Sequence, residues 1–115
     1  MELYYHDIDR DILILSADGG IDSSNADELV AELGKLVDAG ARKLIVDCSR
    51  LGFISSYGIA VLVRLHKKLS ERGGDVKLAA LESRVARLID LLGLERVFQI
   101  YPNVDDARKA FRSGP

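Results

Sequence analysis

Two adjacent serines, Ser55 and Ser56, occupy the one turn of this sequence whose side chains could do chemistry. They follow an apolar strand candidate at residues 43–48 and precede an apolar helix candidate that starts near Ser56 or Tyr57. A hydroxyl at the start of a helix lies among free backbone N–H groups and at the positive end of the helix dipole. A phosphate is favoured there, so one interpretation is that Ser56 is modified. The other is that the serines only cap the helix, because serine is a favoured N-cap residue.

Motifs for catalysis are lacking in the rest of the sequence. The pairs Gly19-Gly20 and Gly73-Gly74 match neither a dinucleotide-binding fingerprint nor a P-loop. His6 and His66 have no histidine or cysteine at metal-ligand spacing, which favours a structural role for both, at the surface or half-buried. The turn around Ser56 lacks the G-x-S-x-G pattern of hydrolases, and no general base is evident for it. The sequence therefore predicts a protein that is not an enzyme and that holds no cofactor and no metal.

Length, charge and cysteine content narrow the class of protein. The 115 residues, 48% of them hydrophobic, have the size of one domain, 1–115, with its own core. A net charge of -2 gives no positive field that would favour nucleic acid or anionic lipid. The apolar runs are too short to span a membrane and the N-terminus lacks signal-peptide features, so we expect a cytoplasmic protein without direct membrane insertion. Cys48 is the only cysteine, which excludes an internal disulfide and favours a small buried residue at a strand end.

The serine turn must be positioned by the elements on either side of it. The strand at 43–48 contains Leu44-Ile45-Val46, the unbroken apolar run of a strand that is buried on both faces. The helix after Ser56 begins with apolar residues nearly all round and then becomes amphipathic. Sites in open α/β sheets tend to lie at the carboxyl ends of the strands, which is where this turn would be.

The N-terminal residues predict two strands. Residues 1–8 and 11–16 are joined so tightly that the two strands must be antiparallel, with the first at the edge of the sheet. Residues 17–22 are rich in glycine and aspartate and are predicted to form a turn.

A helix is predicted next, at residues 25–39. It has a single apolar stripe at helical spacing, formed by Ala26, Leu29, Val30, Leu33, Leu36 and Val37. Ser24 or Asn25 is expected to cap its start, and Gly40 to end it.

The C-terminal half continues the alternation of strands and helices. A strand at 76–81 is followed by a helix that Ser83 can cap. A short strand or extended segment at 97–101 leads to a last helix at 104–112, which we expect Asn103 to cap. The chain is thus predicted to be an α/β fold with a small mixed sheet of four or five strands, packed by about four helices, with residues 43–48 central.

Three stretches resemble the STAS domain family, and in particular its single-domain bacterial anti-sigma-factor antagonists. The core motif of that family is matched by Leu44-Ile45-Val46-Asp47 together with Phe53-Ile54-Ser55-Ser56-Tyr57-Gly58-Ile59. Gly20-Ile21-Asp22-Ser23-Ser24-Asn25-Ala26 is similar to the segment before its first helix. The stretch from Leu92 to Tyr101, with Ala107, is similar to its C-terminal segment. The three stretches occur in the right order over nearly the whole chain.

This resemblance implies a partner switch and assigns residues to it. Ser56 falls on the serine that is phosphorylated by the partner, an anti-sigma factor that is a histidine-kinase-like serine kinase. The unphosphorylated antagonist binds the kinase, the phosphorylated form lets go, and a serine phosphatase resets it. The implied partner-binding residues lie beside Ser56 in the two segments at the sheet edge; they are Asp22, Ser23, Ser24, Asn25, Ser55, Tyr57, Gly58 and Ile59.

Two positions depart from the usual family pattern. Ser55 replaces the aspartate that often precedes the phosphoacceptor, which leaves open which of the two serines is modified. Tyr57 replaces a small residue, so it either alters the partner surface or packs at the helix start.

Two other functions compete with the partner switch. A STAS-like accessory subunit of a lipid-transport complex at the inner membrane would use the same helix start to contact an ATPase constitutively. A small enzyme or nucleotide-binding module would need the base, metal ligands or phosphate loop that the sequence lacks. Gene neighbourhood separates the partner switch from the lipid-transport subunit. A neighbouring kinase and serine phosphatase favour the switch, and a transporter operon favours the subunit.

Overall fold

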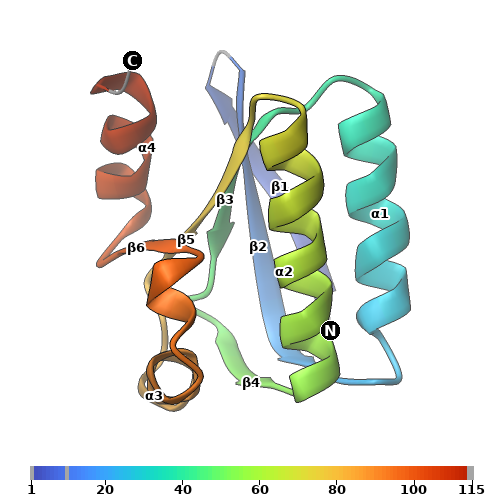
Figure 1. Ribbon diagram of the computed structural model, residues 1–115, viewed down its shortest axis with the longest axis vertical. Helices are drawn as coiled ribbons and strands as arrows, with labels where there is room; N and C mark the ends of the chain where they lie inside the picture. The colour runs from blue at the N-terminus through green and yellow to red at the C-terminus, as the bar shows by residue number, and fades with distance from the viewer. Residues whose placement is uncertain (1, 10, 114–115) are drawn as a thin grey trace.

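The computed structural model describes residues 2–9 and 11–113, and the side chains from 11 to 112. Strands and helices alternate along most of the chain (Figure 1). The elements in order are β1 (Glu2–Asp9), β2 (Ile12–Ile21), α1 (Ala26–Asp38), β3 (Lys43–Asp47), β4 (Leu51–Ile54), α2 (Ser56–Glu71), β5 (Asp75–Ala79), α3 (Ser83–Leu91), the 3-10 turn η1 (Leu94–Arg96), β6 (Gln99–Tyr101) and α4 (Val104–Ser113).

The strands form one mixed sheet. Its main order is β1-β2-β3-β5-β6, in which β1 and β2 are antiparallel and the other neighbours are parallel. The strand predicted to be central lies between β2 and β5, and Leu44, Ile45 and Val46 are only 4%, 0% and 2% exposed. The predicted α/β fold and its central strand are therefore confirmed.

One prediction about the sheet is wrong at the edge that carries the serines. Residues 17–21 continue strand β2 instead of forming a turn, and residues 51–54 form β4, which pairs in parallel with this extension. The pairing register shifts between Gly19 and Gly20, and Gly19 has a φ of 106°. Glycine tolerates that conformation, so the residues that suggested a turn instead allow an irregular strand to continue.

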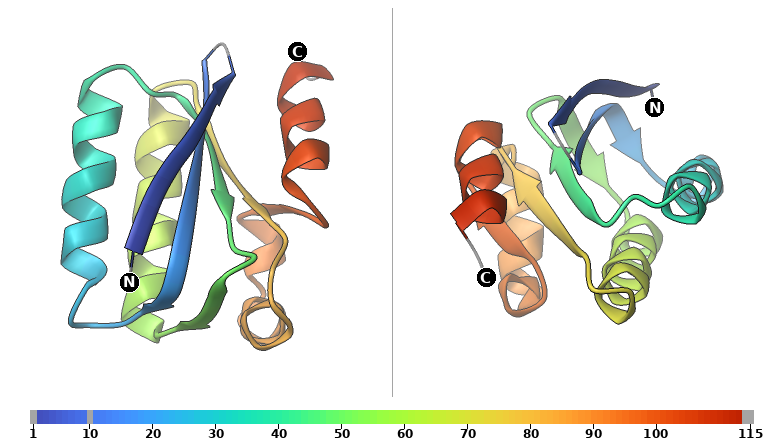
Figure 2. Two further views of the ribbon diagram at one scale, coloured as in Figure 1. Left: turned by 180° about the vertical axis from the view of Figure 1, so that it is seen from behind. Right: turned by 90° about the horizontal axis from the view of Figure 1, so that it is seen from above.

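Helices cover both faces of the sheet (Figure 2). Helices α1, α2 and α3 pack on one face over the larger core, which contains Leu15, Val46 and Leu78 from the strands. Helix α4 covers the other face, where Ala107 lies among Ile12, Ile14, Ile45 and Ala79. Strands β2, β3 and β5 each point alternate side chains into the two cores. The sheet that leads to the serine turn is therefore packed on both faces.

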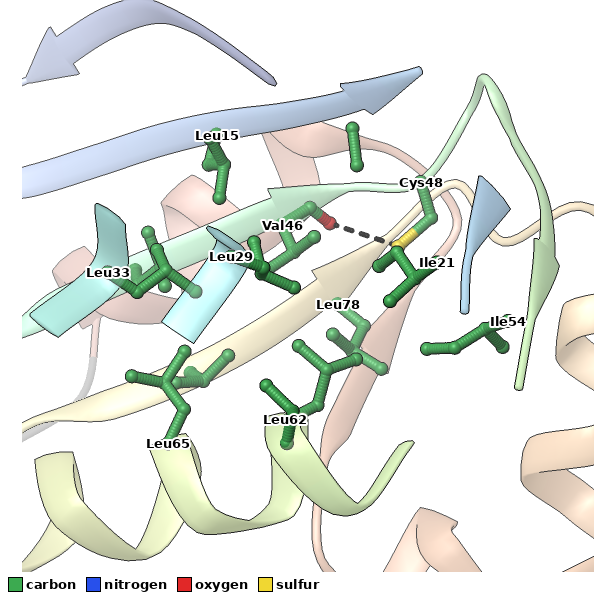
Figure 3. Packing of buried hydrophobic residues seen from close by; sticks show 14 of the residues in the cluster. Leu15, Ile21, Leu29, Leu33, Val46, Cys48, Ile54, Leu62, Leu65 and Leu78 are labelled. Atoms are coloured by element: carbon green, nitrogen blue, oxygen red, sulfur yellow. Dashed lines mark hydrogen bonds between the residues drawn. The ribbon is translucent and has the colours of Figure 1, made fainter. Parts of the chain in front are cut away.

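The larger core contains the single cysteine (Figure 3). Cys48 directly follows β3, is 1% exposed, and its thiol donates a hydrogen bond to the carbonyl oxygen of Val46 at 3.6 Å. Burial, together with the negative charge of Asp47, raises the pKa of this thiol to about 12. The prediction of a small buried residue at a strand end is confirmed, and the thiol stays protonated and unreactive.

The remaining predictions concern single residues. The side chain of Glu82, not that of Ser83, caps α3 by accepting a hydrogen bond from the Arg84 N–H at 3.1 Å. Asn103 caps α4 as expected, because its Oδ1 accepts from the Asp106 N–H at 2.8 Å. His66 is half-buried and structural, with its Nε2 3.1 Å from the Asp75 carboxylate. The side chain of His6 lies outside the described residues.

Candidate functional site

The two segments that carry the predicted site lie side by side at one edge of the sheet. Residues 22–25 follow β2 and residues 55–59 follow β4, and Ile21 pairs with Ile54 at the ends of those strands. The Ser55 N–H donates to the carbonyl oxygen of Ile21 at 2.7 Å, which joins the two segments directly. Figure 1 shows the starts of α1 and α2 at the same end of the molecule. The sequence prediction that these segments are neighbours is confirmed.

Ser55 is the N-cap of α2. Its backbone is extended, with φ -78° and ψ 166°, and its Oγ accepts a hydrogen bond from the Gly58 N–H at 3.1 Å. This bond satisfies one of the backbone donors that every helix start leaves free. The capping role that sequence reasoning left open between two serines therefore belongs to Ser55.

Ser56 is the first residue of α2 and is exposed. Its hydroxyl makes no hydrogen bond within the described part of the chain, in contrast to the hydroxyl of Ser55. The first turn of α2 contains no acidic residue that would oppose an added negative charge. The expected helix start and the expected accessibility of this hydroxyl both agree with the structure.

Gly58 and Ile59 lie beneath the surface and set the position of the helix. A Cβ on Gly58 would lie 2.7 Å from Ile21 Cγ2 and 2.9 Å from Ile54 Cγ1, closer than carbon atoms pack. Ile59 is 6% exposed and belongs to the larger core. Glycine thus allows α2 to approach the ends of β2 and β4, and this close packing fixes Ser56 at the surface.

Tyr57 is 39% exposed and links α2 to α1. Its hydroxyl donates to Asp27 Oδ1 in the first turn of α1 at 2.7 Å. The hydrogen bond to Asp27 and the charge of that carboxylate raise the pKa of the Tyr57 hydroxyl. Sequence reasoning gave Asp27 no place in the site, because the bond joins residues 30 positions apart and depends on how α1 lies against α2.

The loop before α1 is closed by hydrogen bonds among its own residues. Asp22 Oδ1 accepts from the Ser24 N–H at 2.8 Å and from the Ser24 hydroxyl at 2.5 Å, and these bonds lower the pKa of Asp22. Asn25 accepts from the Asp22 N–H at 2.9 Å and donates to the Gly20 carbonyl oxygen at 2.8 Å. Asn25 occupies the N-cap position of α1, which is one of the two positions predicted, but its side chain makes no capping bond to the helix. Ser23 is exposed at the tip of this loop.

The site as a whole presents the free hydroxyl of Ser56, at the start of α2, beside a rim of polar side chains. Among the described residues, no group of three or more His, Cys, Asp and Glu side chains could hold a metal ion. None of the helices described is long and apolar enough to cross a membrane. No acidic or imidazole side chain of the described residues is hydrogen-bonded to the Ser56 hydroxyl, so this site can accept a chemical group from an external donor but does not activate the hydroxyl itself.

Comparison of the sequence with known proteins finds a family model and relatives that match most of the chain. The STAS domain family model matches residues 6–107. BtrV of Bordetella bronchiseptica is 33% identical over 102 residues, which cover 89% of this chain and 88% of BtrV. The anti-sigma-F factor antagonist RsfB of Mycobacterium tuberculosis is 30% identical over 105 residues, covering 90% of this chain and 84% of RsfB.

Solved structures share the fold. The crystal structure of TM1081 from Thermotoga maritima has a TM-score of 0.91 and 25% identity, and the match covers 96% of this chain and 94% of TM1081. The phosphorylated form of SpoIIAA from Bacillus has a TM-score of 0.76 and 16% identity, covering 96% of this chain and 99% of SpoIIAA. The likeness to SpoIIAA is one of fold alone.

Proposed function

This chain belongs to the STAS domain family, and from that premise we propose that it is an anti-sigma factor antagonist controlled by phosphorylation of Ser56. In its unphosphorylated form it binds an anti-sigma factor that is a histidine-kinase-like serine kinase, and so releases the sigma factor. Phosphorylation of Ser56 ends that binding, and a serine phosphatase restores it. This role belongs to the cytoplasm, and the chain acts in it as a binding protein and not as an enzyme.

The observation that carries the proposal is the difference between the two adjacent hydroxyls. Ser55 is half-buried and its hydroxyl accepts from the Gly58 N–H, whereas Ser56 is exposed and its hydroxyl has no hydrogen-bond partner in the described part of the chain. A kinase must reach its acceptor oxygen and align it with the phosphate of ATP. Ser56 meets this requirement without any change in the fold, and Ser55 would first have to give up its cap.

The transfer itself uses groups of the kinase. The Ser56 oxygen attacks the γ-phosphorus of ATP, an O–P bond forms, and the bond from the γ-phosphorus to the β,γ-bridging oxygen breaks so that ADP leaves. The hydroxyl proton passes to a base on the kinase, because no described side chain of this chain is hydrogen-bonded to Ser56. The phosphatase reverses the modification with water and releases inorganic phosphate.

A phosphate on Ser56 would change the docking surface far more than the fold. It adds roughly -1.5 to -2 charges at an exposed position on the surface. The backbone N–H groups at the start of α2 favour an anion, and no acidic residue of its first turn opposes it. The rim around it, formed by Asp22, Ser23, Ser24, Asn25 and Tyr57, is where a partner that fitted the neutral hydroxyl would meet the new charge.

The test uses the intact chain and the histidine-kinase-like ATPase encoded nearest to its gene. The protein is incubated with that kinase and ATP, the phosphorylated residue is mapped by mass spectrometry, and binding is measured by calorimetry with ADP present. We expect one phosphoryl group on Ser56, none in Ser56→Ala, and normal incorporation in Ser55→Ala, which is the matched control.

Binding should follow the same pattern. Ser56→Ala should bind the kinase like the wild type, whereas Ser56→Asp should bind more weakly because it places a negative charge near the phosphate position. Incorporation into Ser56→Ala at the wild-type rate would overturn the assignment of Ser56 and direct the test to Ser55. Equal binding by the phosphorylated and unphosphorylated forms would overturn the switch and favour a constitutive accessory subunit.

A further inference from the structure

An apolar groove opens on the side of β4 that faces away from α1. It lies between β4 and α3 and has a volume of about 310 Å³, and its lining includes Phe53 and Ile54 from β4 and Arg84, Arg87 and Leu91 from α3. Figure 1 shows α3 and the start of α2 on opposite sides of β4, at the same end of the molecule. Only Ser55 separates β4 from α2, so the β4 residues that line the groove lie within a few positions of Ser56 in the chain.

The lining of the groove combines exposed apolar side chains with unpaired positive charge. Phe53 is 56% exposed and Leu91 is 72% exposed, so their apolar surfaces face solvent on both sides of the groove. Arg84 and Arg87 are exposed on α3, and neither guanidinium has an ion pair within the described part of the chain. Contiguous exposed apolar surface rimmed by polar groups is typical of a protein-binding site.

We propose that this groove binds a segment of the anti-sigma kinase that has apolar side chains for the groove and acidic side chains for Arg84 and Arg87. The proposal rests on the proposed function and extends its docking surface from the start of α2 along β4 to α3. Two arginines without partners select acidic groups, and the apolar floor between them selects hydrophobic anchors. A segment with both kinds of side chain is therefore the complement of this groove.

The size of a stable interface supports the extension. A specific protein complex buries about 800 Å² on each partner, so we expect the docking surface to include more than the start of α2 and the loop before α1. Another groove, between the middle parts of α1 and α2, has a smaller volume of about 120 Å³. The groove along β4 is the larger of these two, and its lining residue Ile54 is two positions before Ser56 in the chain.

An acidic partner segment also explains how phosphorylation would weaken binding. Acidic groups that are attracted to Arg84 and Arg87 would approach the neighbouring phosphate on Ser56 and be repelled by it. The same partner chemistry then accounts for binding to the neutral form and for release of the charged one.

Two pairs of variants test the groove, each with a matched control. Leu91→Gln removes an apolar side chain that lines the groove, and Leu92→Gln changes the next residue, which is 52% exposed and lies outside it. Arg87→Glu reverses a charge at the groove, and Lys67→Glu makes the same change of net charge on the exposed side of α2. All four positions are at the surface, so circular dichroism and a thermal melt should show wild-type folding.

Binding of each variant to the kinase with ADP, and the steady-state rate of Ser56 phosphorylation, are then measured. We expect Leu91→Gln and Arg87→Glu to raise Kd and KM roughly tenfold or more, with kcat unchanged, and both controls to stay within about threefold of the wild type. Wild-type Kd and KM in both groove variants would overturn the groove proposal and leave the Ser56 switch standing. A wild-type chain that neither binds the kinase nor accepts phosphate would overturn both, and the mapping experiment on Ser56 identifies that case independently.

Discussion

Helices α1 and α2 start at the same edge of the sheet, yet their first turns differ in chemistry. The start of α1 carries Asp27 and Glu28 and follows a loop closed by Asp22, Ser24 and Asn25. The start of α2 has no acidic residue in its first turn, and its cap leaves the next hydroxyl free. Position at the sheet edge therefore does not by itself make a modification site. The modification site that we propose, Ser56, lies at the helix start whose positive end is not balanced by an acidic first turn and whose first hydroxyl has no hydrogen bond among the described residues.

Helices α1 and α2 also differ in how closely their glycines are packed against the rest of the protein. Gly58 in α2 has Ile21 and Ile54 within 3 Å of where a Cβ would lie, whereas a Cβ on Gly34 in α1 would meet nothing within 4 Å. The free hydroxyl of Ser56 thus sits on a rigidly packed turn.

Replacing these two glycines by alanine should give opposite results. Gly34→Ala should stabilise the protein by about 0.5 to 1 kcal/mol, because alanine forms helix better than glycine. Gly58→Ala gains the same helix propensity but must displace Ile21 or Ile54, so we expect a net loss of roughly 1 to 3 kcal/mol. Urea unfolding of both variants measures the difference. A stabilised Gly58→Ala would show that α2 can move away from the strand ends at no cost.

The sequence predicted this arrangement well where a pattern of several residues carried it. The apolar run of β3, the stripe of α1 and the order of the elements identified the fold and the edge on which the two segments meet. The extension of β2 and the short β4 could not be predicted, because Gly19 and Gly20 carry turn chemistry and only pairing with β4 makes them a strand. The sequence did not predict individual side-chain hydrogen bonds either. Whether Ser55 or Ser56 caps α2, and that Tyr57 contacts Asp27, depend on backbone geometry that side-chain types do not encode.

Alanine at each of the two serines should separate the cap from the free hydroxyl. Ser55→Ala leaves the Gly58 N–H without its acceptor and should cost about 0.5 to 2 kcal/mol of stability. Ser56→Ala removes a hydroxyl that has no partner among the described residues, so the change should lie within about 0.5 kcal/mol of zero. Thermal and urea unfolding provide the measurement. Equal losses in both variants would mean that the cap is shared between the two serines.

An added aspartate should change stability differently at the two helix starts. Ser56→Asp adds a negative charge to a first turn that has none and should gain about 0.3 to 1 kcal/mol at low ionic strength. Ser23→Asp adds its charge next to Asp22 and near the acidic first turn of α1, where we expect no gain or a small loss. Salt should reduce both effects, since the sites are exposed. Unfolding curves at low and high salt test this, and a gain in Ser23→Asp would show that α1 can still accept an anion.

The smallest expected effect is on the titration of Asp22, one of the acidic side chains beside the start of α1. The hydroxyl and then the N–H of Ser24 lower the pKa of this carboxyl below 3.8. A lowered pKa in the folded state means that the ionised carboxylate stabilises the fold above the unfolded value of 3.8, and that this stabilisation is lost as pH falls through the folded pKa. Ser24→Ala removes the largest cause, so the pKa of Asp22 should move back toward 3.8 in an NMR titration. Ser23→Ala changes an adjacent exposed serine and should leave the pKa where it is. If Ser24→Ala does not move the pKa, the Ser24 hydroxyl is not what lowers it, and the backbone N–H of Ser24 becomes the cause to test.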